Sequence, residues 1–424
     1  MATTTASVSD LCLAARAAAR ELAVLPTAVK DRALHAIADA LEARTPEILE
    51  ANGRDMTAGQ EAGLSPALLD RLRLDEGRIV AIAGQTRAIA ALTDPVGEVV
   101  MGRRLPNGLD LTQVRVPLGV VAVVYEARPN VTIDAAALCL KSGNAVVLRG
   151  SSSAAHSNAV LARIAADAAT GAGLPAGAVA LVAGGGREEL AELATQDGVV
   201  DLIIPRGGEG LKAALSAVAT VPVIYAASGN CHVYVDAAAD LDWALDIAVN
   251  AKVQRPGVCN AAETLLVHSD VAAAFLPRAL EALRREGVEL RVDGRAHAAA
   301  GADLAPELVD AKADDWDTEF LALTLAVGIV DSVEEAIAHV NAHGSGHSEA
   351  IVTGDAAAAR AFERGVDAAC VYVNASTRFT DGGEFGMGAE IGNSTQKLHA
   401  RGPIGMRELC TTKYVVRGDG HVRP

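Results

Sequence analysis

The spacing of apolar residues divides the chain into an N-terminal helical stretch and a longer stretch in which strands and helices alternate. Over residues 8–90, alanines and leucines recur at helical spacing, with charged residues on the opposite faces. We expect helices there and no catalytic constellation. Residues 96–116 instead hold two short runs, GEVVMGRRL and LDLTQVRV, separated by Pro-Asn-Gly. This composition predicts a β-hairpin, which is either an oligomerisation arm or a plain surface hairpin.

From Gly119 onward the pattern becomes strand, helix, strand, helix. The successive segments are GVVAVVYE, VTIDAAALCLK, NAVVLRG, a helix from Ser153, AVALVAG, a helix from Arg187, and DLIIPRGG. This alternation predicts a parallel sheet covered by helices, a Rossmann-like layout. Neither G-x-G-x-x-G nor G-x-x-x-x-G-K-[ST] occurs, so a dinucleotide would bind beyond the strand ends and at the helix N-termini that follow them.

Three of these strand ends carry residues suited to an anion. Arg149 and the three serines after Gly150 offer a cation and hydroxyls for a ribose 2′-phosphate, which favours NADPH over NADH. The runs GGGR (184–187) and PRGG (205–208) place glycine N–H groups at the next two ends. Each loop alone is more simply explained as a turn or a capped helix start. Three such loops at corresponding strand ends, however, favour the binding of an anion. The predicted cofactor residues are Arg149, Ser151, Arg187, Arg206, Gly207 and Gly208.

Cys259 is the candidate nucleophile. The helix predicted over Leu241–Lys252 is stopped by Pro256 and Gly257, and a short buried strand is predicted over Thr264–His268, so the thiol lies on a loop. Neighbouring cations favour the reactive thiolate, and Lys252 and Arg255 precede the cysteine. The alternative is a small buried hydrophobe, which is what most free cysteines are.

Composition narrows the class of protein. The chain has 424 residues, 50% hydrophobic and 21% charged, which is typical of a globular protein with two or three domains. A net charge of −16 without a long basic run excludes a nucleic-acid or anionic-membrane surface. The six cysteines are scattered along the chain, which predicts reduced thiols. The N-terminus has the pattern of an amphipathic helix and not that of a signal peptide. We therefore expect a cytoplasmic protein.

Several long strings resemble the gamma-glutamyl phosphate reductase family, the proline-biosynthesis branch of the aldehyde dehydrogenase superfamily. They are VYEARPNVTIDAAALCLKSGNAVVLRG, DLIIPRGG, RPGVCNAAETLLVH, NAHGSGHSEAIVT, VYVNASTRFTDGGEFGMGAEIG and STQKLHARGPIG. The resemblance implies an α/β aldehyde dehydrogenase-like fold in three parts. Residues 1–95 and 118–235, with part of 375–398, would form an NADP-binding domain. Residues 236–374 would form the catalytic domain, and 96–117 with 399–424 an oligomerisation arm.

The same resemblance implies a reaction. The Cys259 thiolate would attack L-glutamyl 5-phosphate, phosphate would leave, and NADPH would reduce the thioester to glutamate 5-semialdehyde. Asn130 and the backbone N–H of Cys259 are the implied oxyanion donors, although Asn130 reads nearly as well as a helix N-cap. Glu319 and Phe320 resemble the superfamily's Glu-x-Phe-Gly-Pro region at the nicotinamide ribose, without the Gly-Pro. The candidate substrate-binding residues are Arg128, Lys252, Arg255, His347 and Arg401, and each cation among them could equally be a surface ion-pair partner.

One departure concerns the general base. Where hydrolytic aldehyde dehydrogenases have Glu-Leu-Gly-Gly, this chain has Tyr225 followed by Ala-Ala-Ser-Gly. Tyrosine is no base for activating water, which suits a phosphate-releasing reductase. His339, His343 and His347 have helical spacing, but no carboxylate or cysteine completes a ligand set nearby, so no metal is expected.

Three other functions stay open at this point. A CoA-acylating or a hydrolytic aldehyde dehydrogenase would keep the fold and the cysteine but use a different acyl acceptor. A non-catalytic assembly partner of glutamate 5-kinase would keep only the interface. The expected partners are the acyl phosphate, further copies of the chain and such a kinase.

Overall fold

The computed structural model describes residues 6–183, 186–225 and 228–423. Its internal contacts divide the chain into two compact units. Unit 1 comprises residues 1–226, 387–392 and 404–424, and unit 2 comprises residues 227–386 and 393–403. Within the described residues, no helix is long and apolar enough to cross a membrane.

Unit 1 begins with the predicted helical stretch. The helices are α1 (Val8–Leu22), α2 (Thr27–Ala43), α3 (Thr45–Glu61), α4 (Pro66–Leu72) and α5 (Glu76–Ala91). Side-chain caps set the starts of several of them: Ser7 accepts from the Asp10 N–H, and Asp75 accepts from the Arg78 N–H. The buried positions of α2, among them Leu34, Ile37 and Leu41, have the spacing of one helix face.

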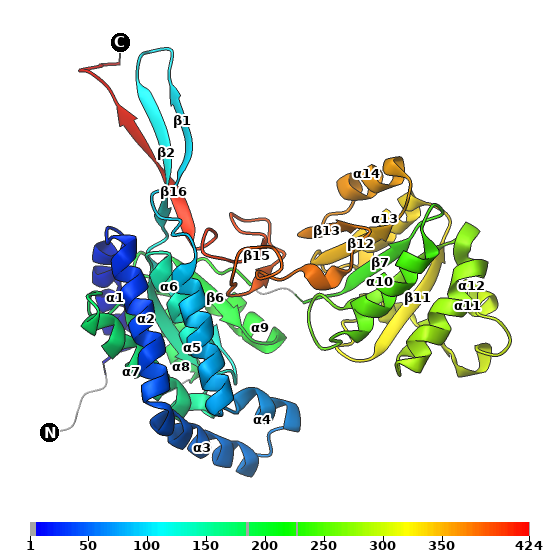
Figure 1. The fold of residues 1–424 in the computed structure, drawn as a ribbon, viewed down its shortest axis with the longest axis horizontal. Helices are drawn as coiled ribbons and strands as arrows, with labels where there is room; N and C mark the ends of the chain where they lie inside the picture. The colour runs from blue at the N-terminus through cyan, green and yellow to red at the C-terminus, as the bar shows by residue number, and fades with distance from the viewer. Residues whose placement is uncertain (1–5, 184–185, 226–227, 424) are drawn as a thin grey trace. The chain divides into compact units, whose positions relative to one another are not determined.

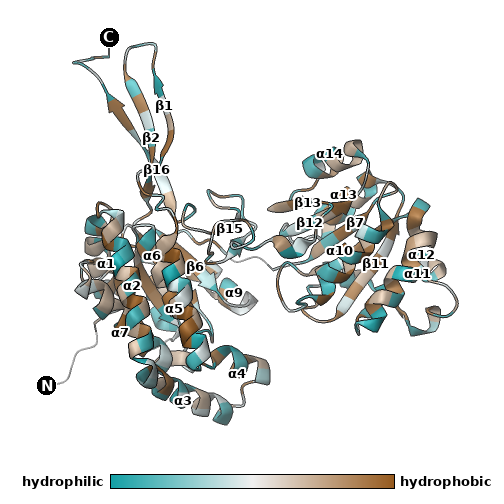
Figure 2. Ribbon diagram, in the orientation of Figure 1, coloured by the Kyte–Doolittle hydropathy of each residue, from teal (hydrophilic) through white to brown (hydrophobic). Residues whose placement is uncertain are grey.

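A four-stranded parallel sheet forms the centre of unit 1. Its strand order is β5-β4-β3-β6. Every residue of β3 and β4 is buried, and Figure 2 shows hydrophobic strands beneath helices of mixed polarity. Helices follow the strands in alternation, as predicted for an α/β fold. The elements are β3 (Val120–Tyr125), α6 (Asn130–Lys141), β4 (Ala145–Gly150), α7 (Ala155–Gly171), β5 (Val179–Leu181), α8 (Arg187–Ala194), β6 (Leu202–Arg206) and α9 (Glu209–Val218).

The predicted hairpin forms a separate three-stranded sheet with the last strand of the chain (Figure 1). Strands β1 (Val99–Arg104) and β16 (Cys410–Arg417) both pair antiparallel with β2 (Asp110–Pro117). Exposed apolar side chains occur on both outer strands, including Val99 at 60% and Tyr414 at 61% exposure.

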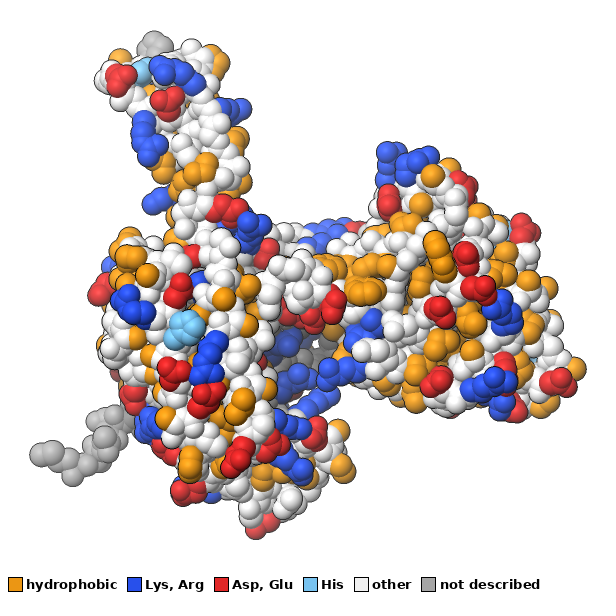
Figure 3. All heavy atoms as spheres, viewed as in Figure 1, with side chains coloured by type: hydrophobic (Ala, Val, Ile, Leu, Met, Phe, Trp, Pro, Cys, Tyr) orange, Lys and Arg blue, Asp and Glu red, His pale blue; other side chains and the backbone are white. Residues whose placement is uncertain are grey.

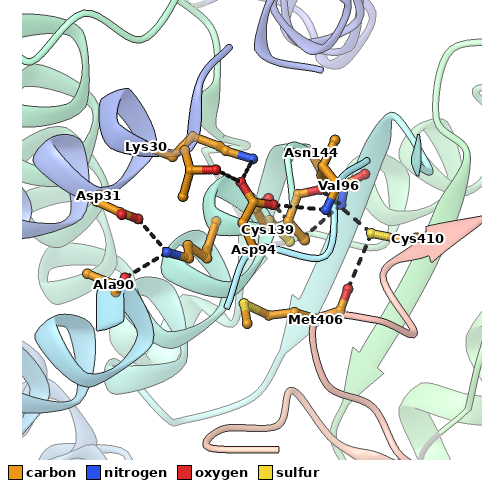
Figure 4. Close-up of polar contacts among 12 residues, drawn as sticks. Lys30, Asp31, Ala90, Asp94, Val96, Cys139, Asn144, Met406 and Cys410 are labelled. Carbon is orange, nitrogen blue, oxygen red and sulfur yellow. Dashed lines mark hydrogen bonds and ion pairs between the residues drawn. The ribbon is translucent and has the colours of Figure 1, made fainter. Parts of the chain in front are cut away.

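Buried polar contacts fix the helices and the C-terminal segment within unit 1 (Figure 4). Lys30 pairs with Asp94, and Lys141 pairs with Asp31 and the Ala90 carbonyl, although both lysine side chains are 1% exposed. The amide of Asn144 donates to the Leu409 carbonyl at 2.9 Å. Such pairs compensate the cost of burying the lysine charges.

Unit 2 is built on a seven-stranded sheet with parallel neighbours, in the order β10-β9-β11-β8-β7-β12-β13. Phe275, Leu276 and Leu280 of α11 belong to the core over one part of this sheet, and Phe362 of α14 to a second core. The elements are β7 (Cys231–Val235), α10 (Leu241–Val253), β8 (Ala262–His268), α11 (Ser269–Arg285), β9 (Glu289–Val292), α12 (Gly294–Ala299), β10 (Val309–Asp310), β11 (Thr324–Val330), α13 (Val333–His343), β12 (Ser348–Val352), α14 (Ala356–Gly365) and β13 (Cys370–Val373). The short pair β14 (Asn393–Ser394) and β15 (Gly402–Pro403) completes it.

The contact division corrects the predicted domain limits. Strand β7 was assigned to the cofactor domain, but it pairs with β8 on one side and β12 on the other, so it lies inside the sheet of unit 2. Of the range 375–398, part of which was predicted to join the cofactor domain, residues 387–392 belong to unit 1 and the rest to unit 2. A strand pattern does not say which sheet the strand joins, because the pairing partners are distant in sequence. The functions predicted for the domains stay predictions.

Candidate active site

Cys259 lies on the loop between α10 and β8, as predicted. All six cysteines lie within the described residues; five are buried, and Cys259 alone is partly exposed. Burial raises the pKa of several of the others, such as Cys12 to about 11 and Cys410 to about 12, and keeps them as thiols. The accessible sulfur is therefore that of Cys259.

Gly229 fixes the backbone beside this cysteine. A Cβ added to Gly229 would lie 1.6 Å from the carbonyl oxygen of Cys259, so any other residue would displace the loop. The N–H of Gly229 donates to Glu319 Oε1 at 2.7 Å. Cys231 Sγ donates to the Cys259 carbonyl at 3.2 Å. Glu319, predicted to contact the nicotinamide ribose, thus also holds the segment that packs against the cysteine.

The residue after the cysteine is anchored to a second segment. Asn260 Nδ2 donates to the carbonyls of Arg378 (3.2 Å) and Thr380 (2.9 Å), and Thr377 Oγ1 donates to the Asn260 carbonyl (2.7 Å). Thr380 continues the network through Ser348 at 2.5 Å. The cysteine loop is therefore held from both sides by hydrogen bonds to its neighbours.

Lys252 was predicted to bind the substrate, and the structure corrects this. Its side chain is 0% exposed and pairs with the equally buried Glu263 at 2.5 Å. Burial lowers the pKa of Lys252 and raises that of Glu263 to about 7. Glu263 Oε1 also accepts from the Leu321 N–H at 3.3 Å. The pair is a buried structural contact behind the loop and not a surface for a phosphate.

Arg255, in contrast, is exposed, and a second arginine that the sequence reasoning missed lies close to it. Arg378 is half-buried, and its Nε donates to Gln254 Oε1 at 2.9 Å. Burial lowers the pKa of Arg378, the charge of Arg255 lowers it further, and Cys259 and Asp381 act in the opposite sense. Arg378 lies in the string VYVNASTRFTDGG, but nothing in that string indicates which loop it packs against.

His347 and Arg401 have defined partners within unit 2. His347 is 0% exposed, bonds Ser348 Oγ through Nδ1 at 2.7 Å, and has its pKa lowered to about 4 by burial. It is therefore neutral at neutral pH and buried in this structure. Arg401 donates to Asp367 Oδ1 at 2.9 Å, which is the ion-pair alternative that the sequence left open. Both residues stay only predictions as substrate contacts.

Asn130 begins α6 in unit 1 and does not cap it. Pro129 occupies the N-cap position, and no side chain bonds the first turn, so the N-cap alternative is wrong. Instead, Asn130 Nδ2 donates to Asp134 Oδ2 at 2.9 Å. Burial raises the pKa of Asp134 to about 6, partly offset by that hydrogen bond and by Arg206. Asn130 lines a cavity of about 320 Å³ with Arg71 and Arg73. Arg128, two residues earlier, is exposed.

The predicted cofactor loops meet at the carboxyl edge of the unit 1 sheet. Arg149 donates to the Gly186 carbonyl at 2.8 Å, which joins the ends of β4 and β5. Ser151 Oγ accepts from the Ala127 N–H at 3.1 Å and bonds Ser153 Oγ at 2.6 Å.

At the end of β6 the Arg206 carbonyl accepts from Glu126, whose carboxylate accepts from the Gly208 N–H at 3.1 Å. A Cβ at Gly207 would lie 2.7 Å from the Glu126 carboxylate. Arg187, the first residue of α8, is exposed, while Gly184 and Gly185 of the same loop lie outside the described residues. The strand ends thus come together at one edge.

Tyr225 is held within unit 1. Its ring packs against the hydrophobic core of the sheet, and its hydroxyl accepts from Ser216 Oγ on α9 at 3.0 Å. A carboxylate is absent from this position of the sequence. The following Ala226 and Ala227 lie outside the described residues.

Comparison with known proteins decides the family. The aldehyde dehydrogenase family model matches residues 1–288 and 276–415. A gamma-glutamyl phosphate reductase from Thermobifida fusca is 57% identical over 96% of this chain and 97% of its own length. One from Kineococcus radiotolerans is 55% identical over 98% and 96%. The chain belongs to the gamma-glutamyl phosphate reductases of the aldehyde dehydrogenase family.

Solved structures agree with this assignment. The crystal structure of gamma-glutamyl phosphate reductase from Thermotoga maritima covers 99% of this chain and 100% of its own, with 44% identity and a TM-score of 0.96. An acetylating aldehyde dehydrogenase from Geobacillus thermoglucosidasius, at 19% identity and a TM-score of 0.67, shares the fold alone. The predicted aldehyde dehydrogenase-like fold is therefore confirmed.

Proposed function

We propose that this protein reduces L-glutamyl 5-phosphate to L-glutamate 5-semialdehyde and phosphate with NADPH, the second step of proline biosynthesis from glutamate (EC 1.2.1.41). The observation that carries the proposal is the exposure of the Cys259 thiol. Among the six cysteines, all of them described by the structure, it alone is partly exposed, and it lies on a loop fixed by Gly229 and Asn260. The chain is also 57% identical to a gamma-glutamyl phosphate reductase.

The Cys259 thiolate attacks the acyl carbon, and a carbon–sulfur bond forms while the carbonyl oxygen takes up negative charge. When the carbonyl re-forms, the carbon–oxygen bond to phosphate breaks and phosphate leaves with its electron pair. A thioester remains on Cys259. NADPH, when bound, supplies the hydride that reduces this acyl group. Breaking the carbon–sulfur bond then releases the aldehyde and restores the thiolate.

Two donors are proposed for the oxyanion, the backbone N–H of Cys259 and the side-chain amide of Asn130. Asn130 Nδ2 carries two hydrogens, and one of them is committed to Asp134. That bond orients the amide. Loss of one oxyanion donor typically raises the barrier by about 3 kcal/mol.

Water is a poor acyl acceptor in this site because the hydrolytic base is missing. The sequence position of the superfamily glutamate holds Tyr225, whose hydroxyl is committed to Ser216. A phenol is not a base at neutral pH, so the thioester persists until it is reduced.

The cofactor is proposed to lie at the carboxyl edge of the unit 1 sheet. The donors there fit a nucleotide: the Arg149 guanidinium, the Ser151 hydroxyl and the backbone at Gly207 and Gly208 come from adjacent strand ends. Arg149 and Ser151 are the proposed partners of a 2′-phosphate, which is why NADPH is preferred to NADH.

The three-stranded arm is proposed to join copies of the chain. Its outer strands β1 and β16 expose Val100 (48%) and Val416 (53%) beside free strand edges. Association with a glutamate 5-kinase, which would deliver the acyl phosphate, stays a prediction that co-purification of the two proteins tests.

The reverse reaction tests the function directly. Purified protein is supplied with pyrroline carboxylate, NADP⁺ and inorganic phosphate, and NADPH formation is followed by absorbance. The proposal requires phosphate-dependent turnover. Turnover with coenzyme A in place of phosphate, or without any acyl acceptor, would assign the chain a different reaction.

A further inference from the structure

We propose that Arg378, together with Arg255, binds the phosphoryl group of the substrate beside Cys259. This inference rests on the proposed function and names a residue that the sequence did not suggest. It follows from where the Arg378 segment is anchored and from the charge that this anchoring places there.

Hydrogen bonds hold Arg378 at both ends of the cysteine loop. Its carbonyl accepts from Asn260, the residue after the nucleophile. Its Nε donates to Gln254, the residue before Arg255. A backbone bond on one side of Cys259 and a side-chain bond on the other place this arginine next to the reactive loop, although 118 residues separate it from Asn260.

Neither Arg255 nor Arg378 is held in a direct ion pair within the part of the chain that the structure describes. The charge of Asp381 and that of the Cys259 sulfur nevertheless favour the protonated form of Arg378. Arg378 is half-buried, its hydrogen-bond partner Gln254 is neutral, and a second guanidinium is close enough to lower its pKa. Two like charges at one loop are unfavourable unless an anion binds there.

The reaction supplies that anion at the required place. The phosphate of an acyl phosphate is bonded to the carbon that Cys259 attacks, so it lies within a few ångströms of the sulfur during the reaction. A guanidinium presents two parallel N–H groups to phosphate oxygens, and it neutralises charge as phosphate departs. Lys252, the other cation near the loop, is already paired with Glu263.

The reverse reaction separates the phosphate from the rest of the substrate, because phosphate and the aldehyde enter as two molecules. Arg378→Gln should raise the KM for inorganic phosphate by about 10- to 150-fold, the effect of one charged hydrogen bond. The KM for pyrroline carboxylate should stay within about twofold, and Arg378→Lys should recover part of the phosphate affinity. Arg360→Gln, an exposed arginine of α14 in the same unit, is the matched control.

A second readout does not need turnover. Inorganic phosphate should slow alkylation of Cys259 by iodoacetamide in the native protein and in Arg360→Gln, but not in Arg378→Gln. An unchanged phosphate KM, an equal rise in both KM values, or full phosphate protection of the Arg378→Gln thiol would each overturn the proposal. If the native protein itself shows no phosphate dependence, the proposed function fails first, and the two failures are thereby distinguished.

Discussion

The buried ion pair of Lys252 and Glu263 predicts a large loss of stability when one of its two side chains is removed. Both side chains are 0% exposed and their charged atoms lie 2.5 Å apart. Each charge compensates the cost of taking the other out of water, so removing one leaves the other uncompensated. Lys252→Met keeps the length of the side chain but leaves the buried Glu263 carboxylate without its positive partner. Burial already raises the pKa of Glu263 to about 7. We expect unfolding free energy to fall by about 3–5 kcal/mol.

Equilibrium denaturant unfolding measures this change, and a thermal scan should show a Tm lower by roughly 6–20 °C if unit 2 unfolds as one domain of ordinary size. The double variant Lys252→Met with Glu263→Gln has no uncompensated charge and should recover most of the loss. Arg278→Met is the control, since it breaks an exposed pair with Asp242 and should cost less than about 1 kcal/mol. A single variant within 1 kcal/mol of the native protein, or a double variant no better than the single, would refute the reasoning.

Three further variants test other parts of the structure. Gly229→Ala forces a Cβ against the Cys259 carbonyl, so turnover should fall about 100-fold or more while circular dichroism shows a folded protein. Near-native turnover would mean that the position of the cysteine loop is unimportant. Asp134→Asn removes a carboxyl group whose pKa in the folded protein is raised from 3.8 to about 6. As pH rises from 4 to 7, the native protein should therefore lose about 3 kcal/mol of unfolding free energy relative to this variant. A difference in urea unfolding that does not change with pH would contradict the raised pKa. Arg149→Met should raise the KM for NADP⁺ about 10- to 150-fold and leave that for NAD⁺ nearly unchanged, and equal effects on both cofactors would exclude a 2′-phosphate contact.

Local signals in the sequence predicted the elements well. Helix α10 ends at Val253, one residue after the predicted limit at Lys252, and the cysteine follows on a loop as expected. The strand ends at Arg149 and Arg206 share one sheet edge because parallel strands separated by helices must align that way. These features depend on residues close together in the chain, which is why a pattern can reveal them.

Features set by distant residues were not predictable. Lys252 is in the last turn of its helix, and only packing of α10 decides that it turns inward to Glu263. Strand β7 looked like the end of the cofactor domain until its pairing with β8 and β12 was known. Arg378 reaches the cysteine loop from more than a hundred residues away. Asn130 is a residue type that often caps a helix, but its side-chain amide instead donates a hydrogen bond to Asp134.

The central claim, that Cys259 carries the acyl group, is tested most directly by isolating that sulfur. Native protein and Cys259→Ala are compared with pyrroline carboxylate, NADP⁺ and phosphate, with circular dichroism to verify folding. We expect phosphate-dependent NADPH formation by the native protein and none above background with Cys259→Ala, since the other five cysteines are buried. Phosphate-dependent turnover that survives the substitution would contradict it.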